Sequence, residues 1–143
     1  MQKQGVLLSN LGTPNAATAL SVAAYLNTFL CDSKVIDLPY LLRQVLVKGL
    51  IVPFRTSRAL KAYRSIWTPE GSPLRVHMQA LQAAVQAKFD AQGQACVVAL
   101  GMRYGEPSIQ QGISDLRKAG CTFLHIVPLY PQYAAATTGS ALS

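Results

Sequence analysis

Two prolines and two tyrosines stand directly after an apolar run near the end of this 143-residue chain. The run, 123–127, reads Phe-Leu-His-Ile-Val, and it continues as Val-Pro-Leu-Tyr-Pro-Gln-Tyr over 127–133. Proline has no N–H to offer a neighbouring strand, so a strand over 123–127 must leave its sheet there. The tyrosines, and the Thr-Thr-Gly-Ser segment at 137–140, are therefore expected at the carboxyl end of a strand. In parallel α/β sheets, that end is where ligands bind.

The elements that would position these residues can be predicted from apolar patterning. Short apolar runs predict buried strands near 5–9, 95–100 and 122–129. Between them we expect helices at 16–30, from Pro39 to a break near Pro53, at 55–66, from Ser72–Pro73 to Gly93, and from Pro107 to Gly120. The order strand, helices, strand, helix, strand predicts an α/β fold with a doubly wound parallel sheet and flanking helices.

Two helical stripes are specific enough to test. In the 16–30 helix, Leu20, Ala23, Ala24, Leu30 and Cys31 share one side and are expected to face inward. In the helix that starts at Ser72–Pro73, the inward stripe is expected to be Leu74, Met78, Leu81, Val85 and Phe89.

Composition narrows the class of protein. Half of the residues are apolar and 13% are charged, as in a globular domain. No apolar run is long enough to span a bilayer, and the first residues lack a signal-peptide pattern, so we expect a cytoplasmic protein. The cysteines are three, widely spaced and without a C-x-x-C pair, which favours buried reduced thiols over a disulfide framework or a zinc site.

The net charge of +7 is concentrated in one segment. Residues 34–64 contain seven basic residues and one acid, Asp37, and so hold +6 of it (7 − 1). Aliphatic residues are interleaved with these charges, and no nucleic-acid-binding motif accompanies them. The pattern favours a peripheral contact of residues 39–58 with the inner face of a membrane, or an apolar-ligand lip. The alternative is an ordinary buried helix with a solvated basic edge.

The two histidines are weak candidates for chemistry. His125 lies inside an apolar strand-like run and is expected to be a core histidine. His77 flanks a helical stripe and is expected to be a partly exposed structural residue. We therefore expect neither histidine to act as a catalytic base or as a metal ligand.

Four motifs together resemble those of the ferrochelatase family. They are Asn-Leu-Gly-Thr-Pro at 10–14, Gly-Ser-Pro-Leu at 71–74, Met-Arg-Tyr-Gly at 102–105, and the 127–133 segment with its Thr-Thr-Gly-Ser continuation. Their order and spacing match the family from about Gly5 to Ser143. The resemblance implies insertion of ferrous iron into protoporphyrin IX, giving protohaem in the last step of haem biosynthesis. It also implies two similar α/β domains, with residues 1–143 an incomplete amino-terminal one. The family's catalytic histidine and its partner acid would lie beyond Ser143, so the chain alone is expected to be inactive.

The resemblance also implies roles for individual residues. At matching positions the family holds the propionates and polar edge of the porphyrin; in this chain these are Arg55, Arg58, Tyr63 and Ser72. The resemblance places Leu11 beneath the ring. Arg103 and Tyr104 follow the second predicted strand, at its ligand end, and Tyr130, Gln132 and Tyr133 are expected to line the floor of the cleft. Leu11 stands where relatives carry Met or Tyr, and the absence of Tyr favours the protoporphyrin type over the coproporphyrin type. Ala134, Ala135 and Ala136 stand where some relatives carry an iron–sulfur ligand, so we expect no cluster ligand there and no firmly bound cofactor.

Several of these residues have a simpler interpretation. Arg55 and Arg58 would equally suit a solvated helix face, and Ser72 a helix cap. Arg103 could cap carbonyl groups, and the tyrosines and glutamine of 130–133 could form a rigid turn.

Two other classes of protein stay open from the sequence. A small homodimeric tetrapyrrole chelatase of the sirohydrochlorin type would suit the length, but it would have a histidine after the first strand, and 9–12 contains none. The other is a porphyrin- or membrane-binding module without catalytic activity.

Overall fold

Three parallel strands form the only sheet in the part of the chain that the computed structural model describes, residues 2–140. They are β1 (Gln4–Asn10), β2 (Cys96–Met102) and β3 (Phe123–Pro128), arranged in the order β2-β1-β3. In the central strand, Val6 pairs with Val98 of β2 on one side and with His125 of β3 on the other. The predicted α/β class with a parallel sheet and flanking helices is confirmed.

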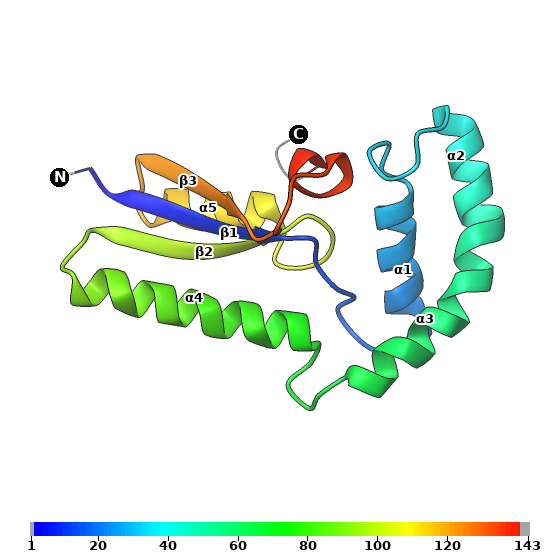
Figure 1. The fold of residues 1–143 in the computed structure, drawn as a ribbon, viewed down its shortest axis with the longest axis horizontal. Helices are drawn as coiled ribbons and strands as arrows, with labels where there is room; N and C mark the ends of the chain where they lie inside the picture. Colours follow the sequence, from blue (N-terminus) through cyan, green and yellow to red (C-terminus); the bar gives the residue numbers. More distant parts are fainter. Residues whose placement is uncertain (1, 141–143) are drawn as a thin grey trace.

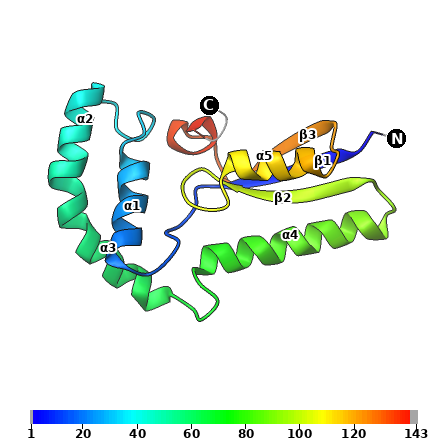
Figure 2. The ribbon, with the colours of Figure 1, turned by 180° about the vertical axis from the view of Figure 1, so that it is seen from behind.

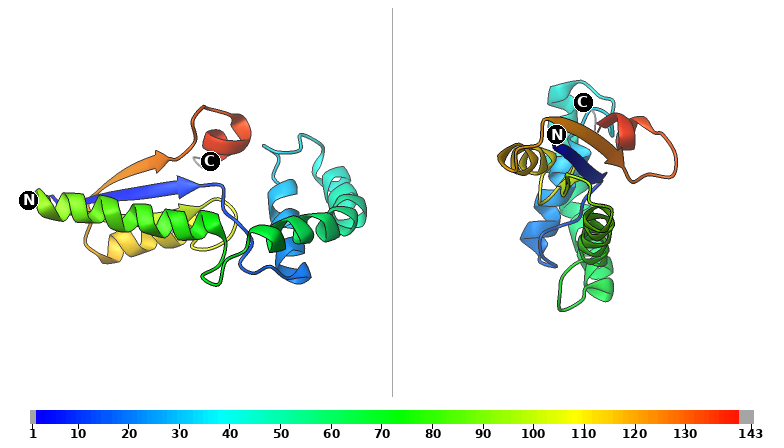
Figure 3. Two further views of the ribbon diagram at one scale, coloured as in Figure 1. Left: turned by 60° about the horizontal axis from the view of Figure 1, so that its bottom comes forward. Right: turned by 90° about the vertical axis from the view of Figure 1, so that its left-hand side faces the viewer.

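Helices cover the two faces of β1 and β2 (Figure 3). Val6 and Leu8 point to one face and pack with Met78 of α4 (Pro73–Ala91). Leu7, between them, points to the other face and packs with Leu116 of α5 (Ile109–Lys118). This alternation follows from the two-residue period of a strand.

The approach of α5 to the sheet depends on a glycine. A Cβ added to Gly112 would lie 2.3 Å from the carbonyl oxygen of Leu100 and 2.5 Å from a methyl carbon of Leu7. Any larger residue would therefore push the helix away from β2.

A second layer of helices stands beyond the carboxyl ends of the strands (Figure 1). It contains α1 (Ala19–Leu30), α2 (Tyr40–Leu46), the π-helical turn η1 (Val47–Ile51) and α3 (Val52–Ile66). Its own core includes Val22, Leu26 and Leu30 of α1 with Val47 of η1. The predicted inward face of α1 is wrong for Leu20, which is 84% exposed, and for Ala24, which is also exposed. The helix packs against α3 through Val22 and Leu26 instead.

The predicted break near Pro53 is also wrong. The chain stays helical from Tyr40 to Ile66, with η1 immediately before Val52 and Pro53. In this wider turn the N–H of Val52 reaches back five residues to the carbonyl of Val47. A proline clashes with the carbonyl four residues before it, and a π-turn opens the ladder at that place. The helix therefore passes through Pro53.

The third strand is more exposed than its sequence indicates. β3 lies at the edge of the sheet, beyond the described helices, and Phe123, Leu124, Ile126 and Val127 are between 36% and 54% exposed. His125 is exposed as well, so its expected role as a core histidine is wrong. Figure 2 views the molecule from behind, and in this view α5 lies in front of the sheet.

Three smaller points complete the comparison with the sequence. Along α4, Met78 is buried and Leu74, Val85 and Phe89 pack on the core, but Leu81 is 40% exposed. All three cysteines are free thiols, and of them Cys96 is buried while Cys31 and Cys121 are half-buried. Within residues 2–140, no helix has the length and apolar character needed to cross a membrane.

Candidate functional site

Three of the singled-out segments meet at the carboxyl end of the sheet (Figure 1). The N–H of Arg103 donates to the carbonyl of Asn10 at 2.9 Å, and the N–H of Tyr104 donates to that of Leu11 at 2.8 Å. On the other side of β1, the N–H of Leu129 donates to the backbone carbonyl of Ser9 at 2.8 Å. The segments that hold Leu11, Arg103, Tyr104 and Tyr130 are therefore neighbours.

The glycine of the first motif allows this close approach. Gly12 has a φ of +106°, and a Cβ there would lie 1.6 Å from the carbonyl oxygen of Tyr104. No side chain fits at that distance, so only glycine can occupy the position. The carbonyl of Gly12 also accepts a hydrogen bond from the hydroxyl of Tyr25 at 3.2 Å, which links α1 to the same loop.

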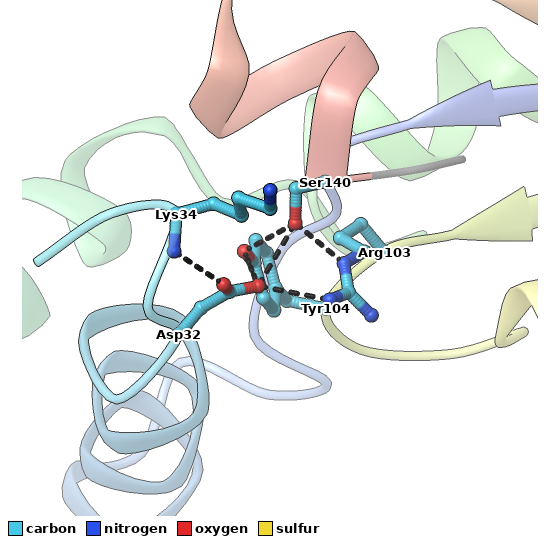
Figure 4. A network of polar contacts seen from close by, with 5 residues as sticks. All are labelled: Asp32, Lys34, Arg103, Tyr104 and Ser140. Carbon is cyan, nitrogen blue, oxygen red and sulfur yellow. Dashed lines mark hydrogen bonds and ion pairs between the residues drawn. The ribbon is translucent and has the colours of Figure 1, made fainter. Parts of the chain in front are cut away.

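A polar cluster centred on Asp32 lies beside these loops (Figure 4). Its Oδ2 atom accepts hydrogen bonds from Arg103 Nη2 at 2.9 Å, the Tyr104 hydroxyl at 2.7 Å and the Ser140 hydroxyl at 2.8 Å. Its Oδ1 atom accepts from the N–H of Lys34 at 2.8 Å. Arg103 Nε also donates to the Ser140 hydroxyl at 2.7 Å. The cluster connects the α1–α2 loop, the β2 loop and the Thr-Thr-Gly-Ser segment.

The cluster favours a charged Asp32 and a neutral Tyr104. Burial opposes ionisation of Asp32, but the N–H of Lys34, the two hydroxyls and Arg103 together hold its pKa below the ordinary value. Burial, together with the carboxylate of Asp32, raises the pKa of Tyr104 to about 12, against the opposing effects of Ser140 and Arg103. Tyr104 is therefore a hydrogen-bond donor at neutral pH.

A row of aromatic rings runs from the helical layer to this cluster. Trp67 lies edge-on to Tyr63 with ring centroids 6.4 Å apart, and Tyr63 lies edge-on to Tyr25 at 6.4 Å. Tyr25 stacks on Phe29 at 6.2 Å, and Phe29 meets Tyr104 edge-on at 5.2 Å. We call these five residues the aromatic row. Burial raises the pKa values of Tyr25 and Tyr63, so their hydroxyls are neutral donors as well.

Two hollows flank the end of the aromatic row. The first, about 350 Å³, lies between the 13–15 loop, α1 and the 103–106 loop. The second, about 430 Å³, lies between α1, α2 and Arg103. Both are lined by Thr28, Arg103 and Tyr104. Arg103 is the basic residue that the two hollows share, and its side chain is 30% exposed.

The structure brings together only part of the expected site. Leu11, Tyr63, Arg103, Tyr104 and Tyr130 belong to the connected loops or to the aromatic row. Burial raises the pKa of Tyr130, and the positive charge of Arg103 opposes that shift.

The other expected residues lie apart from the two hollows. Arg55 and Arg58 are exposed on α3, and Gln132 and Tyr133 are exposed after β3. Ser72 is buried at the N-cap position of α4, where its side chain makes no capping hydrogen bond.

Asp32, Tyr25 and Phe29 were not anticipated as site residues. Asp32 is separated from Arg103 by 71 residues, and nothing in the spacing connects them. One signal was available, because Asp32 is an acid just before a strongly basic segment. Within residues 2–140, no group of three or more His, Cys, Asp or Glu side chains could hold a metal ion.

Known proteins resemble this chain along almost its whole length. A family model described as "Ferrochelatase" matches residues 3–143. Proteins named "Ferrochelatase" are 50% identical to it in Edwardsiella ictaluri (strain 93-146), 49% in Coxiella burnetii (strain Dugway 5J108-111) and 48% in Legionella pneumophila subsp. pneumophila (strain Philadelphia 1). These matches cover 97%, 98% and 98% of this chain but 42%, 39% and 41% of the relatives. The chain thus spans about two fifths of the length of the curated relatives it matches.

Proposed function

This chain belongs to the ferrochelatase family, and on that premise we propose that it forms one wall of a cleft that binds protoporphyrin IX for the insertion of ferrous iron. The observation that carries the proposal is the meeting of three family motifs at the carboxyl end of a parallel sheet, beside the aromatic row. A porphyrin is a flat apolar ring with two carboxylates, and it requires aromatic walls with a few cationic or hydroxyl donors.

The residues of this chain would divide that work by their chemistry. Leu11 would offer apolar surface and Arg103 a cation, while the ring of Tyr104, which is buried, supports the site from below through Phe29 and the Arg103 guanidinium. Arg55, Arg58 and Ser72 are proposed to hold the propionates at the rim, with Tyr130, Gln132 and Tyr133 on the floor.

We propose that the isolated chain binds porphyrin but does not insert iron. A base must reach the pyrrole protons, within hydrogen-bond distance or through one water. His125 pairs with Val6 in mid-strand, and His77 is exposed on α4; neither lines one of the two hollows. The catalytic histidine and acid are proposed to belong to a second α/β domain of the whole protein, with residues 1–143 in the amino-terminal one.

Protoporphyrin fluorescence and an iron-insertion assay test this proposal on the isolated chain. We expect saturable quenching that Arg103→Ala weakens and that Arg117→Ala, an exposed arginine of α5, leaves unchanged. We also expect no insertion above the uncatalysed rate. Absence of any porphyrin binding would contradict the cleft, and turnover would contradict the missing base and favour a small dimeric chelatase.

The intact mass of the protein from its own cells tests the two-domain arrangement. Relatives more than twice as long as this chain support a mass well above 15.4 kDa. A native protein of 15.4 kDa would contradict the arrangement and favour a non-catalytic binding module.

A second candidate function is a peripheral contact of residues 39–58 with the cytoplasmic face of a membrane. Leu41, Val45 and Phe54 are between 71% and 76% exposed, and Lys48, Arg55 and Arg58 are exposed cations of the same helical run. Arg43 does not contribute, because it is buried and its Nη1 donates to the carbonyl of Leu38 at 2.9 Å. Exposed apolar side chains with cations are typical of helices that lie on anionic lipid.

Co-sedimentation with anionic vesicles tests this contact. We expect binding that falls with added salt and that the double variant Leu41→Ser with Val45→Ser reduces. Leu20→Ser, on α1, is the matched control because Leu20 is 84% exposed yet lies outside the segment. Binding that is insensitive to the double variant would exclude residues 39–58 as the contact.

A further inference from the structure

We propose that Asp32 is a positioning residue of the cleft, whose carboxylate holds the Arg103 guanidinium in the orientation that faces the porphyrin. The inference rests on the proposed function, since it gives Asp32 a role only if Arg103 lines a porphyrin cleft.

The carboxylate of Asp32 is itself fixed on both sides. The N–H of Lys34 binds Oδ1 at 2.8 Å, while Oδ2 receives the guanidinium and two hydroxyls at 2.7–2.9 Å. The side chain of Asp32 is only 9% exposed, so water does not compete for these bonds. A carboxylate held in this way cannot turn without losing several charge-assisted hydrogen bonds.

Arg103 is held at one end and open at the other. Its Nη2 and Nε atoms are engaged by Asp32 at 2.9 Å and Ser140 at 2.7 Å, and its guanidinium carbon lies 5.4 Å from the ring centroid of Tyr104. The side chain is 30% exposed and lines both hollows. Asp32 therefore orders Arg103 before a ligand arrives. Ordering one long side chain during binding costs about 0.5–1.5 kcal/mol, which corresponds to about a two- to tenfold loss of affinity.

A double-mutant cycle on the isolated chain separates positioning from mere packing. Asp32→Asn is expected to weaken protoporphyrin binding about two- to tenfold. Asp32→Asn combined with Arg103→Ala is expected to bind no more weakly than Arg103→Ala alone, because Asp32 acts through Arg103. Asp37→Asn, an exposed acid of the same loop, is the matched control and should bind as the parent does. Additive losses, or parent-like binding by Asp32→Asn, would overturn the proposal.

A readout without porphyrin distinguishes failure of this inference from failure of the proposed function. In ¹⁵N NMR spectra of the ligand-free chain, the Nη2–H of Arg103, which donates to Asp32, should give a slowly exchanging signal that Asp32→Asn removes while the backbone signals of the sheet persist. An unchanged Nη2–H signal would overturn the inference. Absence of porphyrin binding by the parent would instead count against the proposed function.

If Asp32→Asn fails to fold, Asp32→Glu takes its place. It keeps the charge but displaces the carboxylate by one methylene, so we expect a shifted Nη2–H signal and weaker porphyrin binding. Parent-like values for both quantities would overturn the proposal.

Discussion

The side chain of Tyr104 belongs both to the aromatic row and to the polar cluster around Asp32. Its ring ends the aromatic row against Phe29, while its hydroxyl donates to Asp32 at 2.7 Å and lies 3.1 Å from the hydroxyl of Ser140. Tyr104→Phe keeps the ring and removes one donor from a buried carboxylate. Loss of one partner of a buried polar group costs about 1–3 kcal/mol, and we expect the free energy of unfolding to fall by about that amount.

Urea unfolding followed by circular dichroism measures this effect. Tyr133→Phe is the matched control, because Tyr133 is 76% exposed and its substitution should change stability by less than about 0.5 kcal/mol. Equal stabilities of the two variants would mean that the hydroxyl of Tyr104 contributes nothing to the fold.

The depressed pKa of Asp32 predicts how stability depends on pH. The folded state holds this pKa below the unfolded value of about 3.9, so ionised Asp32 stabilises the fold above that pH. The contribution is lost as the pH falls through the folded-state pKa. The difference in unfolding free energy between the parent and Asp32→Asn should therefore be largest near neutrality and shrink below about pH 4. A difference that stays constant from pH 7 to pH 3 would rule out this role.

For individual residues, a position directly after a predicted strand was enough to single out Arg103 and Tyr104 as candidate site residues. It could not select their partner, because Asp32 follows a helix 71 residues earlier and its turn has no distinctive spacing. The role of Tyr25 was hidden for a similar reason. A tyrosine within a helix indicates packing, and only the fold shows that it meets Tyr63 and Phe29.

At the scale of elements, α4 covers the free edge of β2 with glutamine side chains. Gln86 accepts from the N–H of Val98 at 2.8 Å and donates to the carbonyl of Cys96 at 3.0 Å, in the manner of a neighbouring strand. Gln82 donates to the carbonyl of Val98 at 2.8 Å. An edge strand with unpaired backbone N–H and C=O groups can pair with another chain. The glutamine side chains of α4 hydrogen-bond to such groups on β2.

Gln86→Ala should therefore destabilise the chain by about 1–2 kcal/mol, since it removes two hydrogen bonds to the backbone of β2 that water replaces only in part. Thermal unfolding of the variant beside Gln79→Ala, an exposed glutamine of the same helix, measures the difference. Equal melting temperatures for the two variants would show that water replaces the hydrogen bonds of Gln86 without a loss of stability.

Apolar runs predicted the three strands to within two residues at each end. The helix through Pro53 was missed because proline normally ends a helix, and the π-turn that accommodates it has no signature in a 3.6-residue period. The inward face of α1 was misassigned because Leu20 fits the same helical spacing as residues that are inward, while the choice between faces depends on where α3 lies.

At the scale of the whole molecule, the two edges of the sheet differ. The β2 edge is covered by α4, whereas β3 presents exposed Ile126 and Val127 and pairs, among the described strands, only with β1. We expect the isolated chain to self-associate as its concentration rises. Ile126→Lys should lower the association, as charged residues do on natural edges.

Sedimentation velocity over a concentration series measures the association. Leu81→Lys, which places the same charge at a residue of α4 that is 40% exposed, is the control. A parent that stays monomeric, or an equal effect of the two lysines, would argue against β3 as the associating surface.

The parallel α/β class followed from the alternation of strands and helices, but the exposure of β3 did not. An apolar run indicates a buried strand, and whether helices cover it depends on its place in the sheet. His125 was misassigned for this reason, since its neighbours are apolar yet the strand lies at an edge.

The strand order β2-β1-β3 also sets a sequence of events during synthesis. The ribosome makes the central strand first, and its first partner begins 92 residues later (96 − 4) at Cys96. At about 5–20 residues per second, β1 waits for about 5–20 s before any part of the sheet can form. All residues of α1 to α4 have been made by then, and their hydrogen bonds, which are local, can begin to form before the sheet does. The nascent chain therefore carries an apolar, unpaired strand during this interval, which is when chaperones would be most needed.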